Sequence, residues 1–306
     1  MGETARVRLA LIANPHSGTA PAPERLEALL AQDGAEVHAT AIDELTGAEG
    51  RGLDEEGLAD AVRKLSAPGR PQRVVVAGGD GSIGPAALLA AEIGVPLAAI
   101  PVGTANDFAR ATGLPLDLRA AAALARSPRA STRHAELAFA GGRPFVNAAS
   151  AGLSVVAADA AKPYKPRLGA LAYAVGALRA GATASPLRCT IACDGAEVFA
   201  GGAWQVVVAA TGAFGGGSEI GGTDPTDEQL DIAIVPAGSR LALVRRAYGM
   251  RTGKLTRQGD VAHHRGAVIE VQIAGRRGAF NVDGELCPCN PPRFDLRRGG
   301  FDLVVR

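Results

Sequence analysis

The chain has 306 residues, 47% of them hydrophobic, which is enough to build two hydrophobic cores of ordinary size. Its 32 basic and 31 acidic side chains leave a formal net charge of +1, which argues against a nucleic-acid-binding domain. The sequence holds no run of about eighteen apolar residues, so we expect a cytoplasmic protein without a transmembrane helix.

The first part of the chain alternates strand-like runs with amphipathic stretches. Apolar runs at 8–13, 74–77 and 97–100 are typical of buried strands, and stretches with helical periodicity lie between them. This alternation predicts a three-layer α/β domain with a parallel sheet over residues 1–133. Helices are expected at 23–32, 58–65 and 85–92, and the polar, glycine-rich stretch 47–57 is expected to be an exposed loop.

The second part, residues 134–306, changes to short alternating β-like segments, which predict an all-β sandwich-like domain. One helix is expected within it, at 168–179. A return of the last ~15 residues to the first domain stays open. The strands are expected at 144–148, 187–193, 204–210, 230–235, 268–273 and 301–305.

The four cysteines lie at 189, 193, 287 and 289. This spacing does not resemble the paired CxxC turns of a four-thiolate zinc site. We therefore expect reduced, partly buried thiols, since a free cysteine behaves as a small hydrophobic residue.

The strongest local motif follows the apolar run at 74–77, which leads directly into Gly78-Gly79-Asp80-Gly81-Ser82. Glycines at such a turn allow backbone N–H groups to approach phosphate oxygens closely. The helix that follows directs its partially positive N-terminus to the same place. A tight glycine turn capped by an aspartate is the alternative interpretation of this motif alone.

Two further loops follow strand-like runs in the same way. The first is Asn14-Pro15-His16-Ser17-Gly18, and the second is Gly103-Thr104-Ala105-Asn106-Asp107, where Asn106 and Asp107 are expected to cap a helix. In parallel sheets, ligands bind beyond the carboxyl ends of the strands. Three such loops on one sheet edge therefore predict a nucleotide site.

Together with the late Asp283-Gly284-Glu285, these motifs resemble the diacylglycerol kinase catalytic family and its sphingosine-kinase-like relatives. The resemblance covers nearly the whole chain, and the order and spacing of the motifs make it specific. It implies an ATP- and Mg²⁺-dependent lipid kinase whose active site lies in a cleft between the two domains. The GGDG motif alone is shared with phosphofructokinases and NAD kinases.

The resemblance also implies roles for particular residues. Asp80, Asp283 and Glu285 are the implied catalytic carboxylates, and we favour Glu285 as the base, although a plain hairpin turn at 283–285 is the alternative. The implied nucleotide-binding residues are Asn14, Ser17, Gly78, Gly79, Asp80, Gly81, Ser82, Thr104 and Asn106. The implied metal ligands are Asp80, Asp107, Glu136 and Asp227.

The chain departs from the family pattern at 224–231. Many relatives have an Asp-Gly pair there, at a structural Mg²⁺ site, whereas this chain has Asp227 followed by Glu228. Asp227 remains the candidate ligand, and a solvated acidic loop is the alternative of equal weight.

The implied acceptor is a lipid hydroxyl, with diacylglycerol as the first choice; sphingoid bases, ceramide-like lipids and polyketide-like alcohols stay open. A kinase of a soluble acceptor, as in NAD kinase or phosphofructokinase, and a non-catalytic nucleotide- or lipid-binding regulator are the alternatives. Transient contact with the inner face of the membrane and a homodimer are also left open. The basic and aromatic residues suited to an anionic membrane surface are Lys162, Tyr164, Lys165, Arg167, Tyr173 and Arg179.

Overall fold

The computed structural model describes residues 7–18, 20–46, 54–164, 171–214, 218–220, 223, 227–240, 242–275, 280–287, 293–297 and 299–306. The chain forms two compact units. The first unit comprises the chain up to Leu137, Gly142–Phe145 and Arg297–Arg306, and the second comprises Ala138–Gly141 and Val146–Leu296. The last segment of the chain therefore belongs to the first unit.

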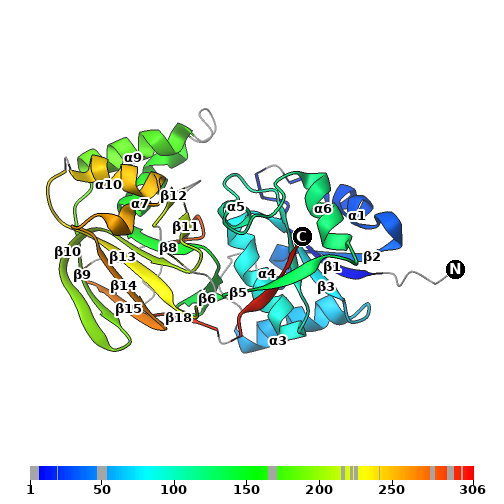
Figure 1. Cartoon of the computed structure of the whole chain (residues 1–306). Helices are drawn as coiled ribbons and strands as arrows, with labels where there is room; N and C mark the ends of the chain where they lie inside the picture. The colour runs from blue at the N-terminus through cyan, green and yellow to red at the C-terminus, as the bar shows by residue number, and fades with distance from the viewer. Residues whose placement is uncertain are drawn as a thin grey trace. The chain divides into compact units, whose positions relative to one another are not determined.

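A mostly parallel sheet forms the centre of the first unit (Figure 1). Its strands are hydrogen-bonded in the order β2-β1-β3-β4-β19-β5, and only β5 runs antiparallel to its neighbour. The predicted α/β domain with a parallel sheet is confirmed. The strands are β1 (Arg8–Ala13), β2 (Glu36–Ala41), β3 (Arg73–Gly78), β4 (Leu97–Pro101), β5 (Ser131–Ala135) and β19 (Phe301–Val305), and β7 (Arg143–Phe145) packs on α4.

Helices cover this sheet on both faces, so its strands read as nearly continuous apolar runs. Leu9 and Leu11 of β1 share a core with Leu26 and Leu30 of α1, and α6 packs on the same face. Each fully buried leucine contributes about 1.5–3 kcal/mol to stability. The helices are α1 (Pro23–Leu30), α2 (Ile42–Thr46), α3 (Glu55–Ser66), α4 (Asp80–Ile93), α5 (Asp107–Ala111) and α6 (Leu118–Arg126).

Two expected boundaries in this unit are wrong. The helix expected at 85–92 begins at Asp80, because the Asp-Gly-Ser segment itself forms its first turn, with Gly79 at the N-cap position. The expected loop 47–57 overlaps helix α3, whose N-cap Asp54 accepts a hydrogen bond from Gly57 N (2.9 Å). Residues 47–53 lie outside the described ranges.

The second unit is organised by the long strand β10 (Figure 1). Its first half pairs with β9, and its second half pairs with β8 on one edge and β13 on the other. Register shifts near Glu197 and Ala203 interrupt the ladders, and such irregularities bend a strand. The strand thereby joins two groups of antiparallel strands, which confirms the sandwich-like second domain.

The hydrogen-bonded order in this unit is β17-β16-β8-β10-β9-β15-β18-β6, with β13 beside β10 and β14 beside β13. The strands are β6 (Ala138–Ala140), β8 (Ala148–Gly152), β9 (Leu187–Cys193), β10 (Ala196–Ala209), β11 (Ala213–Phe214), β12 (Ser218–Glu219), β13 (Leu230–Pro236), β14 (Ala262–Gly266), β15 (Val268–Ile273), β16 (Phe280–Val282), β17 (Glu285–Cys287) and β18 (Arg293–Leu296).

Most of the expected strands are confirmed, but two expectations fail. The strand expected at 144–148 is divided between β7 and β8, because Val146 N and Asn147 N donate to the Asp283 carboxylate. The strand at 301–305 exists but pairs with β4 and β5 of the first unit.

The second unit also contains more helices than expected. The expected helix at 168–179 corresponds to α9 (Leu171–Thr183), and residues 165–170 lie outside the described ranges. Helices α7 (Leu153–Ala161) and α10 (Ala242–Arg251) are not predicted. α7 and α9 pack so closely that a Cβ at Gly176 would lie 2.2 Å from Ala157 O.

The cysteines differ in state. Cys189 and Cys193 are free and buried, and burial raises the pKa of both thiols. Cys287 is disulfide-bonded, so the expectation of a reduced thiol is wrong at this position. Spacing along a chain does not reveal which sulfur atoms a fold brings within bonding distance.

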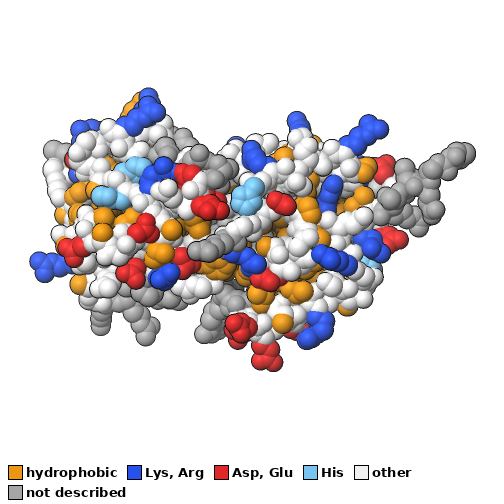
Figure 2. Space-filling model, turned by 60° about the horizontal axis from the view of Figure 1, so that its bottom comes forward, with side chains coloured by type: hydrophobic (Ala, Val, Ile, Leu, Met, Phe, Trp, Pro, Cys, Tyr) orange, Lys and Arg blue, Asp and Glu red, His pale blue; other side chains and the backbone are white. Residues whose placement is uncertain are grey.

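The surface and the helices agree with the balanced composition. On the face drawn in Figure 2, Lys and Arg are interspersed with Asp and Glu on both units. Of the helices in the described ranges, none is both long and apolar enough to span a bilayer.

Candidate active site

Three loops meet at the carboxyl ends of β1, β3 and β4. The loop after β1 is attached to the loop after β3 by two side chains: Asn14 Nδ2 donates to Ser82 Oγ (2.8 Å), and Ser17 Oγ accepts from Gly79 N (3.0 Å). The loop after β4 joins through Val102 N, which donates to Gly78 O (3.0 Å). The structure therefore brings the three predicted loops together.

Two glycine backbones lie close together between these loops. A Cβ at Gly103 would lie 2.5 Å from Gly79 Cα, and a Cβ at Gly79 would lie 3.3 Å from Gly103 Cα. Carbon atoms that are not linked through bonds do not lie 2.5 Å apart, so residue 103 must be glycine for the loops to keep this separation.

The start of helix α5 is capped by a different side chain from the ones expected. Asn106 occupies the N-cap position of α5 at φ 53°, but its side chain closes the loop onto Gly103, accepting from Gly103 N (2.9 Å) and donating to Gly103 O (3.0 Å). Asp80 Oδ1, from the neighbouring loop, accepts from Phe108 N at the start of α5 (2.9 Å). The expected cap is therefore supplied by Asp80, and it ties two loops together.

Two other predicted ligands, Asp107 and Glu136, are buried in the same unit, with 4% and 6% of their surface exposed. Within the described ranges, no three or more His, Cys, Asp or Glu side chains are grouped to bind a metal ion on their own. Mg²⁺ in kinase sites is commonly held by one or two carboxylates together with the substrate phosphates. These carboxylates are of the right type for that arrangement.

In the second unit, Asp283-Gly284 forms the two-residue turn between β16 and β17, with positive φ at both residues (47° and 87°). The hairpin turn that the sequence left as the alternative is thus present. The Asp283 carboxylate accepts three backbone hydrogen bonds, from Val146 N (2.8 Å), Asn147 N (2.9 Å) and Ala148 N (3.2 Å). Its position suits a brace that fixes this segment.

Glu285 has a different environment from Asp283, only two residues away. It is exposed at the start of β17, whereas Asp283 is 8% exposed. Asn147, which lies within the segment that Asp283 fixes, has a further contact: its Oδ1 accepts a hydrogen bond from Thr211 Oγ1 (2.9 Å). The two carboxylates of the motif therefore differ in exposure and bonding.

Sequence reasoning missed these supporting residues. Nothing in the local pattern indicates that Val146–Ala148 binds Asp283, because the partners are more than a hundred residues apart. The Asp80–Phe108 contact likewise joins separate loops. The only local signal for the Asp283 contact was the Asp-Gly pair itself, since aspartate side chains in turns often bind backbone N–H groups.

The basic and aromatic residues proposed for membrane contact are described only in part. Tyr164 and Arg179 are exposed. Lys165 and Arg167 lie outside the described residues, as do the side chains of Lys162 and Tyr173.

Comparison with known families matches both parts of the chain. Residues 8–138 match the diacylglycerol kinase catalytic domain, and residues 147–305 match the YegS C-terminal NAD kinase beta sandwich-like domain. A probable lipid kinase YegS-like protein of Pseudomonas fluorescens is 34% identical over 239 residues, covering 75% of this chain and 76% of the relative. A diacylglycerol kinase of Bacillus subtilis is 27% identical over 227 residues, covering 72% and 73%.

Solved structures share the fold. A diacylglycerol kinase from Bacillus anthracis superposes with a TM-score of 0.73 at 23% identity, covering 99% of both chains. Yeast NADH kinase complexed with NADH superposes with a TM-score of 0.52 at 14% identity, covering 98% of this chain and 84% of the kinase. With both family matches and the Pseudomonas relative, the chain belongs to the lipid kinases that join a diacylglycerol kinase catalytic domain to a YegS-type C-terminal domain.

Proposed function

We propose that this kinase transfers the γ-phosphate of ATP to a lipid hydroxyl, with diacylglycerol as the first candidate acceptor. The observation that carries the proposal is the junction of three loops at the carboxyl ends of β1, β3 and β4, where Gly79 and Gly103 pack backbone against backbone. The glycines at this junction place no Cβ in the way of a phosphate group, and helix α4 begins there with its N-terminus, which favours an anion.

The residues of this junction have distinct roles in the proposed site. Asn14 and Ser17 hold the first loop on the second, and Asn106 fixes the third loop in shape. The N-terminus of α4 at Asp80 supplies partial positive charge for the phosphates. Phosphoryl transfer depends chiefly on such positioning and electrostatic stabilisation.

Mg²⁺ bound with the nucleotide would neutralise charge on the phosphates. Asp80, Asp107 and Glu136 are the carboxylates of the first unit that we propose for it. Their oxygen donors fit a hard cation. Asp80 would have two roles, since it also anchors the start of α5.

We assign the acceptor side of the reaction to Glu285. An exposed carboxylate can accept the proton of an incoming hydroxyl, whereas the oxygens of Asp283 already accept three N–H groups. Asp283 would then position the segment around Asn147 instead of acting as the base.

Single-turnover ATP consumption in the presence and absence of diacylglycerol micelles tests the function. ATP should be consumed quickly only with the lipid. Glu285→Gln should lower kcat by roughly 10²–10⁴-fold, the usual contribution of a general base. Its melting temperature should stay unchanged because the side chain is exposed. Near-normal turnover of the variant would remove Glu285 from the mechanism.

A soluble acceptor is the second candidate, and the fold similarity to an NADH kinase is the observation in its favour. The same assay with NAD(H) in place of lipid distinguishes the two. Consumption of ATP with NAD(H) but not with any lipid would identify the chain as a kinase of a soluble acceptor. A chain that binds ATP but turns over with neither acceptor would be a regulator.

A further inference from the structure

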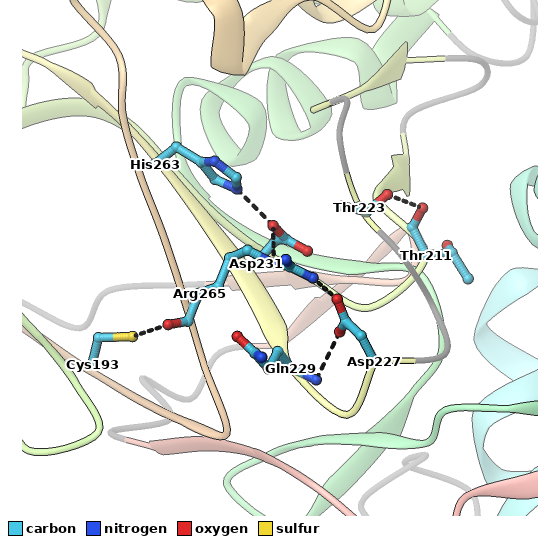
Figure 3. Close-up of polar contacts among 8 residues, drawn as sticks. All are labelled: Cys193, Thr211, Thr223, Asp227, Gln229, Asp231, His263 and Arg265. Carbon is cyan, nitrogen blue, oxygen red and sulfur yellow. Dashed lines mark hydrogen bonds and ion pairs between the residues drawn. The ribbon is translucent and has the colours of Figure 1, made fainter.

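A cluster of charged side chains lies on β13 and β14 of the second unit, outside the residues assigned to catalysis (Figure 3). The two strands are antiparallel, with Asp231 opposite Arg265 and Ala233 opposite His263. Asp227 lies just before β13, and its carboxylate points to the guanidinium of Arg265. Two carboxylates, one guanidinium and one imidazole thus share one site.

Asp231 is the buried member of this cluster, with none of its side chain exposed. Its Oδ1 contacts His263 Nε2 at 2.6 Å and Arg265 Nε at 3.4 Å. Its Oδ2 has no hydrogen-bond partner within the described part of the chain. A buried carboxylate is costly unless a positive group compensates it, so Asp231 depends on a cation nearby.

Asp227 is occupied as well. Its Oδ2 forms an ion pair with Arg265 Nη2, and its Oδ1 accepts from Gln229 N at 3.0 Å. Arg265 therefore contacts Asp227 through Nη2 and Asp231 through Nε. The planar guanidinium fork is suited to bridging two carboxylates in this way, because its donors point in fixed directions.

The turn at Asp227 keeps a shape that glycine normally supplies. Glu228 has φ 57°, in the left-handed region. The substitution of glycine therefore has not removed the turn. What differs from the implied Mg²⁺ site is the partner of the Asp227 carboxylate. That partner is the guanidinium of Arg265, which carries a fixed positive charge. A divalent cation does not fit beside this group, since the guanidinium already pairs with the Asp227 carboxylate and its positive charge repels the ion.

We propose that Arg265 is a built-in cation that replaces a structural metal ion in this loop. It pairs with Asp227 and Asp231 together, offsets part of their negative charge and fixes the start of β13 at any concentration of Mg²⁺. The inference is independent of the acceptor and of ATP use. It removes one of the two metal sites that the sequence suggests.

The experiment measures thermal unfolding without nucleotide, so that no nucleotide-bound Mg²⁺ is present. The wild-type Tm should be the same in EDTA and in excess Mg²⁺. Arg265→Gln should melt several degrees lower in EDTA and should regain part of this loss in Mg²⁺, because Asp227 and Asp231 then lose the guanidinium that they share. A wild-type Tm that rises with Mg²⁺, with the rise lost in Asp227→Asn, would overturn the proposal.

Further variants separate charge from geometry. Arg265→Lys keeps the positive charge but loses the fork, so it should melt lower than wild type and remain insensitive to Mg²⁺. The double variant Arg265→Gln/Asp227→Asn should not show the partial recovery of Tm in Mg²⁺ that is expected for Arg265→Gln alone. Arg188→Gln removes an exposed arginine of β9 in the same unit and serves as the control. If Arg265→Gln does not fold, calorimetric titration of folded wild type and Asp227→Asn with Mg²⁺ decides: equal heats support the proposal, and a binding heat confined to wild type contradicts it.

Discussion

The two units fix their predicted functional residues by different means. In the first unit, the loops are held by the close approach of glycine backbones, with short polar side chains between them. In the second unit, one carboxylate, Asp283, binds three backbone N–H groups of a distant segment. A site built from backbone contact should fail when an atom is added, and a site built on one side chain should fail when an atom is removed.

The largest effect should follow from adding one carbon atom in the first unit. In Gly103→Ala, the new Cβ would lie 2.5 Å from Gly79 Cα and 2.9 Å from Asn106 Oδ1. Overpacking of this kind costs about 1–3 kcal/mol of stability. The loops must also separate, and a shift near 1 Å at a reactive site can lower the reaction rate about 10²-fold. Calorimetric titration with a non-hydrolysable ATP analogue should show weaker binding than in wild type.

The control for this prediction is Gly259→Ala, at an exposed glycine where the added Cβ would have no heavy atom within 4 Å. It should bind the analogue as wild type does. Gly79→Val tests the same contact from the other loop, where the Cβ would lie 3.3 Å from Gly103 Cα. Unchanged affinity in Gly103→Ala would show that the nucleotide is held elsewhere.

The second effect should follow from removing atoms in the second unit. Asp283→Ala leaves three buried N–H groups without their acceptor, and each such group typically costs about 1–3 kcal/mol. Partial relaxation would reduce the sum, so we expect a loss of at least about 2 kcal/mol in urea unfolding. Asp283→Asn keeps one acceptor oxygen and tolerates the positive φ, so its loss should be smaller.

A second Asp-Gly turn of the chain provides a matched control. Asp194-Gly195 joins β9 to β10 with similar positive φ values (49° and 83°). Within the described residues, its exposed carboxylate accepts one backbone hydrogen bond from another strand, from Val268 N at 2.9 Å. Asp194→Ala should therefore cost clearly less stability than Asp283→Ala. Equal losses would mean that the turn conformation, and not the brace, determines the effect.

The sequence predicts those features that depend on neighbouring residues. The apolar runs of β1, β3 and β4 and the glycine loops after them follow from local pattern, and the structure places the loops at one sheet edge. It does not predict partners that are distant in the chain. Asp80 on Phe108 N, Asp283 on Val146–Ala148 and Arg265 on Asp227 are all contacts of this kind. A propensity-based pattern also misses α7 and α10, where packing on the sheet decides the conformation.

The smallest effect is expected at a carboxylate whose largest contact is with a side chain. Asp260 contacts Arg246 (3.0 Å) and Arg245 (2.7 Å), and the hydrogen bond from Arg246, with the charges of both arginines, lowers the pKa of Asp260. A lowered pKa means that the folded state favours the ionised form. The pair therefore stabilises the fold fully above the ordinary pKa of aspartate, and this contribution disappears as pH falls through the lower folded value.

Asp260 is more than one third exposed, so solvent screens the pair and Asp260→Asn should cost under about 1 kcal/mol at neutral pH. Urea unfolding of wild type and Asp260→Asn across a pH series measures this difference directly. It should be constant from neutral pH down to mildly acidic pH and should then shrink, because protonation turns the wild-type carboxyl into a neutral group like the amide. A difference in unfolding free energy that stays constant into strong acid would show that Asp260 acts through hydrogen bonding alone. Its charge would then contribute nothing to the stability of the fold. In this it would resemble Asp283, whose expected contribution comes from fixed acceptor geometry.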